Sequence, residues 1–272
     1  MSAKDIAARY AAEATNIVDM IAHLTQLRTK NTISIGELEL AAEAGLLSLH
    51  TAFEAFVREL FLQCVTGTAD IRHVKSRLRF IPAEDVPTLI AGDRPFLEWL
   101  PVDRTVDRAL IHLRSGQPFV RLWQRQEILR HLELMHIARN RIAHSSEQAL
   151  AKYKKMISKG EAAFTQPGRW LIHSPSTKTN LQLIAEATIA VSIALSVDDR
   201  TPSQLGSAKM KEGQRAAPGT YRCDNCRRIQ HLPVWDKLKP CRHCSSSTKC
   251  STCGNIEHTK TDWTLEALKA VG

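Results

Sequence analysis

Strand signals are nearly absent from the first 197 residues. Alternation of apolar and polar residues is rare there, and the apolar residues recur at three- and four-residue spacing instead. This pattern predicts a single all-α domain over residues 1–197, a helical bundle with about five main helices. Helices are expected over residues 4–29, 35–65, 102–113, 123–144, 148–157 and 179–197, with Gly67 as a C-cap and a turn at Pro167-Gly168-Arg169-Trp170.

No long hydrophobic run is evident either. The longest apolar region, residues 181–197, is interrupted by Gln182 and Glu186, whereas a membrane-spanning helix needs about 20 predominantly apolar residues. Residues 1–10 contain three charged side chains and no apolar stretch of signal-peptide length. We therefore expect a soluble, cytoplasmic protein without a membrane partner.

The sequence also lacks an acidic excess. Its 37 Lys and Arg residues outnumber its 28 Asp and Glu residues, which leaves a formal charge of +9 at pH 7. Residues 198–272 contain 13 basic and 8 acidic residues, so 13 − 8 = +5 of that charge belongs to the C-terminal part. A basic chain favours polyanionic partners, nucleic acid above all and an acidic membrane surface less so.

Cysteine is scarce until the last fifty residues, where six of the seven cysteines form three Cys-x-x-Cys pairs. Cys223 and Cys226 are separated by fourteen residues from Cys241 and Cys244, and this spacing can bring two cysteine knuckles around one tetrahedral zinc ion. So small a module has too little core to fold alone, and the metal would contribute folding free energy. Because every ligand position has a cysteine available, the expected zinc is structural.

The third cysteine pair and two histidines leave the ligand set open. Cys250 and Cys253 have the same spacing as the first two pairs, and His243 and His258 are spare nitrogen donors. One of the predicted pairs could be replaced by these residues, because both arrangements occur in zinc modules.

Composition changes sharply after the helical region. Residues 198–219 contain prolines and glycines and few apolar side chains, which predicts a flexible linker. Residues 220–272 are expected to form a zinc-ribbon tail with short β-strands. The stretch 219–244, with Tyr221-Arg222-Cys223 at its start and Pro240-Cys241 before the second pair, resembles bacterial zinc-ribbon tails of the rubredoxin-like type. Such tails bind nucleic acid or protein.

One short stretch of the expected helix 123–144 is unusual for its position. In Arg139-Asn140-Arg141-Ile142-Ala143-His144, the arginine lies in the middle of an apolar stripe, where a guanidinium is costly to remove from water. Asn140 and His144 are one helical turn apart and share a face. Ser145 and Ser146 predict that the helix ends close to His144. The stripe consists of Ile128, Leu132, Met135, Arg139 and Ile142.

On an ideal helix the side chains of Arg139 and His144 point about 140° apart. A single helix would therefore not bring both onto one phosphate group without distortion or a very long reach, whereas two copies of the stretch in a two-fold dimer could. Arg130 and His136 form a second, looser pair of the same residue types. Such pairs are expected by chance in a basic chain, so the surrounding segments must decide.

Several of these segments, in this order, resemble the HEPN domains, and within them the RiboL-PSP-type group, over roughly residues 30–195. The hexapeptide matches the family's motif of an arginine, a polar residue, three further residues and a histidine. The other matching segments are Thr51-Ala52-Phe53-Glu54-Ala55-Phe56, Trp99-Leu100-Pro101, Gly116-Gln117-Pro118-Phe119 and Pro167-Gly168-Arg169-Trp170-Leu171.

The resemblance implies an all-α homodimer that acts as a metal-independent endoribonuclease, in a toxin-like or phage-defence role that could involve an antitoxin or another protein partner. The RNA 2′-hydroxyl would attack the adjacent phosphate and leave a 2′,3′-cyclic phosphate and a 5′-hydroxyl. His144 would act as general base or acid, because histidine side chains titrate near neutrality. Arg139 would neutralise charge on the phosphoryl oxygens and Asn140 would position the phosphate or the histidine. Glu54 is a further catalytic candidate.

Other functions are also consistent with the sequence. In a non-catalytic HEPN dimer, Arg139 would form an interface salt bridge, His144 would cap a helix, and the zinc ribbon would serve as an adaptor for RNA or protein. Alternatively, the ribbon would make the protein a DNA-binding regulator, with the helical domain used only for dimerisation. For Glu54 the alternative is an exposed carboxylate or one paired within its own helix.

Overall fold

The computed structural model describes residues 1–71, 74–78, 84–91, 97–114, 116–124, 126–159 and 164–196, together with six short strands in the C-terminal part. The chain divides into two compact units, Met1–Val197 and Asp198–Gly272. The described residues of the first unit form helices and no strand, which confirms the all-α prediction for that part of the chain.

Capping residues set the ends of the two longest helices. α1 (Ala3–Thr29) and α2 (Ile35–Thr66) both begin with a capping box. In α2, the Ser34 hydroxyl accepts from the N–H of Glu37 while the Glu37 carboxylate accepts from the N–H of Ser34. Gly67 follows the last turn with a φ of +75°, the left-handed conformation of the C-cap that the sequence predicts there.

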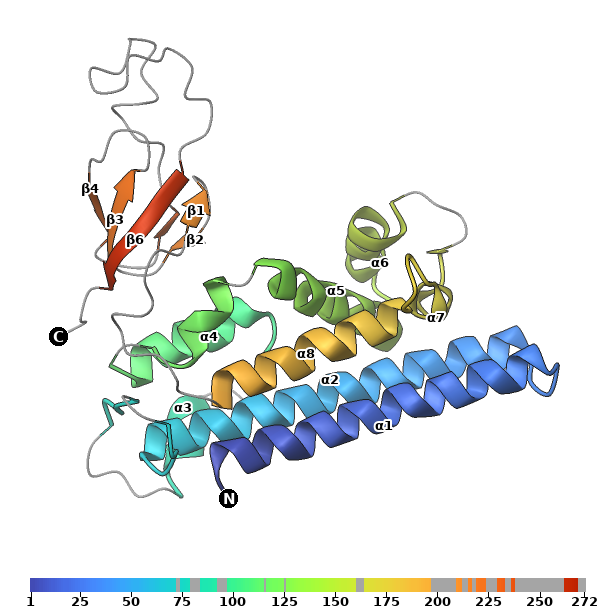
Figure 1. Cartoon of the computed structure of the whole chain (residues 1–272), viewed down its shortest axis with the longest axis horizontal. Helices are drawn as coiled ribbons and strands as arrows, with labels where there is room; N and C mark the ends of the chain where they lie inside the picture. Colours follow the sequence, from blue (N-terminus) through green and yellow to red (C-terminus); the bar gives the residue numbers. More distant parts are fainter. Residues whose placement is uncertain are drawn as a thin grey trace, which may run out of the picture. The chain divides into compact units, whose positions relative to one another are not determined.

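α1, α2 and α8 (Asn180–Ser196) form the main core of the helical unit. Figure 1 shows α1 and α2 as two long neighbours with α8 lying along them, and α8 contacts both. Many positions of α8 are alanine or serine, which permits close approach of its neighbours. By length and composition alone α2 could cross a membrane, but 44% of the relevant window is buried inside the protein, and a core helix passes the same test.

Shorter helices connect α2 to α8. α5 (Gln126–Ala143) packs on α8 and on α2, and α6 (Glu147–Tyr153) packs on α5. α5 contains the first five residues of the hexapeptide, so these contacts position the candidate site. The connecting elements are α3 (Val86–Ala91), α4 (Val102–His112), η1 (Phe119–Gln124), α5 (Gln126–Ala143), α6 (Glu147–Tyr153), η2 (Lys154–Ser158) and α7 (Pro167–Ile172).

α7 occupies residues 167–170, where the sequence predicts a turn, and that prediction is wrong. Pro167 sits at the start of the helix, where no backbone N–H is needed. Gly168 lies so close to α2 that an added Cβ would come within 2.5 Å of the Glu39 carbonyl oxygen, and its N–H donates to the Glu43 carboxylate at 2.8 Å. Contact with α2 therefore accounts for a helix that local signals do not indicate.

The second unit contains short antiparallel strands. β1, β6, β3 and β4 form one sheet in that order, and β2 pairs with β5. β1 and β2 fall within residues 198–219, for which composition predicts a linker, so pairing with later strands gives this segment regular structure. The strands are β1 (Lys209–Lys211), β2 (Arg215–Ala216), β3 (Gly219–Cys223), β4 (Ile229–Leu232), β5 (Asp236–Lys237) and β6 (Asp262–Leu268).

Candidate active site

Arg139, Asn140 and His144 come together at the C-terminal end of α5. The Arg139 Nη1 donates to Asn140 Oδ1 at 3.0 Å and lies 3.4 Å from His144 Nε2. Arg139 and Asn140 are half-buried, and His144 is exposed. Because a guanidinium can only donate hydrogen bonds, the His144 nitrogen that faces it presents a lone pair. The three side chains of the predicted motif are therefore grouped within one chain.

The end of α5 explains how Arg139 and His144 meet. The helix ends at Ala143, as the two following serines predict, and the His144 N–H still donates to the Asn140 carbonyl at 3.0 Å. His144 thus lies just beyond the helix, and the long Arg139 side chain reaches it. The long reach of the arginine is one of the two exceptions that helix geometry leaves open for a single chain, so a second copy is not needed to bring these two side chains together. The homodimer itself stays a prediction.

Asn140 also links Arg139 to the half-buried His136. Its Nδ2 lies 3.0 Å from the Nε2 of His136, one helical turn earlier on α5. Since Asn140 Oδ1 accepts from Arg139, the amide nitrogen faces His136 and donates to it. His136 Nε2 is then an acceptor, so the ring is neutral and its proton is on Nδ1. The amide orientation that holds Arg139 therefore requires a neutral His136.

His136 stacks on His50 of α2, with ring centroids 6.1 Å apart. Burial, and to a smaller extent the nearby charge of Arg139, lowers the pKa of His50 to about 4. Burial likewise lowers the pKa of His136 to about 4, with help from the neighbouring His50, Lys152, Arg139 and Arg104. Both imidazoles are consequently uncharged at neutral pH. Within the described residues, His50 Nε2 and His136 Nδ1 are buried without a hydrogen-bond partner.

Glu54 lies at the inner end of this group of side chains. Its Oε1 accepts from the N–H of Trp99 at 3.0 Å and from the N–H of Leu100 at 3.3 Å, and its Oε2 lies 3.6 Å from His50 Nδ1. The carboxylate thus fastens the segment before α4 to α2. It contacts His50 rather than the three residues of the motif, so its geometry suits a positioning role.

A pocket of about 340 Å³ lies beside these side chains, and His136 forms part of its lining. It lies between the start of α4, the middle of α5 and Lys152 of α6. Pockets of about this size are at the lower end of the range for small-molecule sites.

The predicted zinc ligands fall almost entirely outside the described part of the chain. Cys223 is the last residue of β3, whose antiparallel partner β4 follows after five residues. Nothing is described for Cys226, Cys241 and Cys244, or for the alternative ligands Cys250, Cys253, His243 and His258. Among the residues that are described, no cluster of three or more His, Cys, Asp or Glu side chains could hold a metal ion.

His50 and His136 were not predicted as members of this site, although His136 formed the looser pair with Arg130. The signal was present in the spacing. His136 precedes Asn140 by four residues and His50 precedes Glu54 by four, so each histidine shares a helix face with a predicted site residue.

Comparison with known proteins adds no family assignment. No family model, curated protein or solved structure matches this chain. The likeness to HEPN domains therefore rests on the matching segments of the sequence.

Proposed function

We propose that the protein is a metal-independent endoribonuclease of the HEPN type. The observation that supports this most directly is the grouping of an arginine, an amide and an exposed histidine within hydrogen-bond range at the end of α5. The arginine offers a planar fork for a phosphate, and the histidine offers a lone pair for a proton. A group that binds the phosphate and a group that accepts a proton are what attack by the RNA 2′-hydroxyl on the adjacent phosphate calls for.

In this reaction the Arg139 guanidinium would turn from His144 to the phosphate. The freed lone pair of His144 Nε2 would then take the proton of the ribose 2′-hydroxyl as that oxygen attacks the adjacent phosphorus. The bond from phosphorus to the 5′-oxygen breaks, and the leaving oxygen takes up a proton from solvent. The products are a 2′,3′-cyclic phosphate and a 5′-hydroxyl. Arg139 would neutralise the charge that develops on the phosphoryl oxygens, and Asn140 would hold Arg139 in place. No step needs a metal ion.

The wider proposal keeps the other expectations from the sequence. The protein would act as a cytoplasmic homodimer on RNA, in a toxin-like or phage-defence role. Cys223, Cys226, Cys241 and Cys244 would hold a structural zinc, and the position of Cys223 at the end of β3, in a β-hairpin with β4, supports a ribbon there. The tail would help to hold RNA or a protein partner.

The test is RNA cleavage by the purified full-length protein in excess EDTA, with analysis of the product ends. We expect 2′,3′-cyclic phosphate ends, and a fall of about 100-fold or more in the cleavage rate for Arg139→Ala and for His144→Ala. The matched controls are Arg28→Ala and His23→Ala on α1, which remove the same residue types at the same five-residue separation. Arg28 even donates to an asparagine, Asn31, at 3.0 Å. Both control variants should cleave at the wild-type rate.

Two results would contradict an endoribonuclease. One is RNA that stays intact at micromolar protein, and the other is cleavage that survives both Arg139→Ala and His144→Ala. Intact RNA that nevertheless binds the protein would favour the non-catalytic adaptor.

A further inference from the structure

The pocket beside His136 has a lining of mixed character. Its floor includes the buried side chains of Val102 and Leu132. Its rim includes the exposed side chains of Asp103, Arg130, Glu133 and Lys152. Apolar side chains together with a rim that has both charge signs suit a planar ligand with hydrogen-bond donors and acceptors at its edge. They suit a bare phosphate poorly, because the Glu133 carboxylate would repel it.

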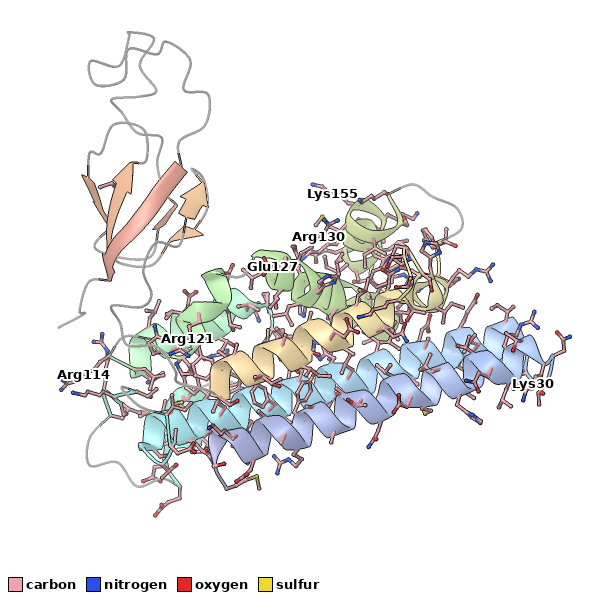
Figure 2. All side chains as sticks on the ribbon, in the orientation of Figure 1. Lys30, Arg114, Arg121, Glu127, Arg130 and Lys155 are labelled. Atoms are coloured by element: carbon pink, nitrogen blue, oxygen red, sulfur yellow. The ribbon has the colours of Figure 1, made fainter. Side chains whose placement is uncertain are left out.

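The pocket is joined directly to the candidate active site. His136 lines it, and the same ring accepts from Asn140, whose amide oxygen holds Arg139. Two hydrogen bonds therefore separate the pocket wall from the guanidinium proposed to bind the scissile phosphate. Figure 2 shows Arg130 on α5 next to α6, the helix that supplies Lys152 to the rim. A nucleotide whose phosphate lies against Arg139 would have its base within reach of this pocket.

The charges on the rim distinguish among the four RNA bases. Guanine has two adjacent N–H donors, at N1 and N2, and two adjacent acceptors, at O6 and N7. A carboxylate such as Glu133 can accept from both donors, and an arginine or lysine can donate to both acceptors. Adenine and uracil have neither two adjacent donors of this kind nor two adjacent acceptors, and cytosine lacks the two adjacent N–H donors.

We propose that this pocket binds a guanine base next to the scissile phosphate, which would make the enzyme select RNA sites that contain guanine. Glu133 accepts from the N1 and N2 edge, and Arg130 or Lys152 donates to O6 and N7. The inference rests on the proposed endoribonuclease function, because the pocket is placed relative to that reaction.

The test is to map cleavage positions on a mixed RNA pool for three proteins: wild type, Glu133→Gln and Glu127→Gln. Glu127 is an exposed carboxylate on the same helix, labelled in Figure 2, and does not line the pocket. We expect about ten-fold enrichment of guanine at one position beside the cut, since one good bidentate contact discriminates by about that much. Glu133→Gln should reduce the enrichment to about two-fold, and Glu127→Gln should leave it unchanged.

Two outcomes of the mapping would overturn the inference while leaving the endoribonuclease intact. One is cleavage with no base preference, and the other is a guanine preference that Glu133→Gln does not change. Neither outcome depends on the rate of the reaction, so each is distinguishable from loss of activity.

If no variant cleaves RNA, the proposed function fails and the pocket is tested by binding alone. Titration calorimetry with guanosine 3′-monophosphate and cytidine 3′-monophosphate measures this on the full chain. About ten-fold tighter binding of the guanosine nucleotide, lost in Glu133→Gln and kept in Glu127→Gln, would support a guanine site. Equal binding of the two nucleotides would overturn it.

Discussion

The side chains around Arg139 form a buried half and an exposed half, and the two halves differ in what they can do. The buried half consists of the buried His50 with the half-buried Glu54 and His136, and it joins α2 to α5. The exposed half consists of the half-buried Arg139 and the exposed His144 at the end of α5. His50 is only 3% exposed, whereas His144 is open to solvent. Both halves contain histidine, yet only His144 is fully open to solvent, while His136 is half-buried where it lines the pocket.

This difference indicates that the two halves have different roles. A histidine with a pKa of about 4 is neutral at physiological pH and is poorly suited to exchange protons there. It can serve as a fixed hydrogen-bond acceptor, as His136 does for Asn140. Asn140 connects the halves, because its nitrogen faces His136 and its oxygen faces Arg139. The buried half thus positions the exposed half, and each half can be perturbed separately.

Acid should destabilise the fold through the buried half. The pKa of His50 and that of His136 lie near 4 instead of 6.5, so between these pH values the unfolded chain binds protons that the folded chain does not. The free energy of unfolding therefore rises with pH through this window, and it decreases again as the pH falls. We expect a loss of roughly 3 kcal/mol from pH 6.5 to pH 4, after allowing for solvent screening at the half-buried His136. Urea denaturation followed by far-UV circular dichroism measures it.

The control for this pH dependence is a pair of matched substitutions. His50→Gln keeps polar groups at the buried position but does not titrate, so its loss of stability in acid should be about half that of the wild type. His144→Gln makes the same change in the exposed half and should keep the wild-type pH dependence. A wild-type pH dependence in His50→Gln would mean that the buried histidines are not responsible.

At constant pH, alanine substitutions in the two halves should lower the free energy of unfolding by different amounts. His50→Ala leaves a cavity between α2 and α5 and removes the histidine that Glu54 faces, so we expect a loss of about 2 kcal/mol in the free energy of unfolding. His144→Ala removes an exposed side chain and should cost less than about 0.5 kcal/mol. Urea denaturation of both variants at neutral pH makes the comparison, and equal losses would contradict the assignment of one half as structural.

Most helices that the sequence predicts correctly follow from signals in neighbouring residues. The ends of α2 follow from Ser34, Glu37 and Gly67, which act within one turn of the positions they cap. The sequence predicts a turn in place of α7 because this helix depends on the fit of Gly168 against Glu39, which is far away in the sequence. A pattern confined to neighbouring residues contains no information on such a contact.

The candidate site shows the same limit. The motif residues Arg139, Asn140 and His144 could be predicted because they are close in sequence and match a family pattern. Their actual geometry could not, because it depends on where α5 ends and how far one arginine side chain extends. The contact between His50 and His136 joins two helices whose pairing the sequence does not specify. Long-range packing therefore supplies the buried half of the site.

Asn140, which joins the two halves, offers the smallest and most specific perturbation. Asn140→Leu keeps the size of the side chain but removes its bonds to Arg139 and His136. Because Arg139 stays present and loses only its support, we expect RNA cleavage to slow by about ten-fold, less than on removal of the arginine itself. The fall should appear in kcat with little change in KM, since a misdirected guanidinium stabilises the transition state less. Ser145→Ala, an exposed change beside His144, is the control and should leave both constants unchanged. Wild-type kcat in Asn140→Leu would show that the exposed half orients itself without the buried one.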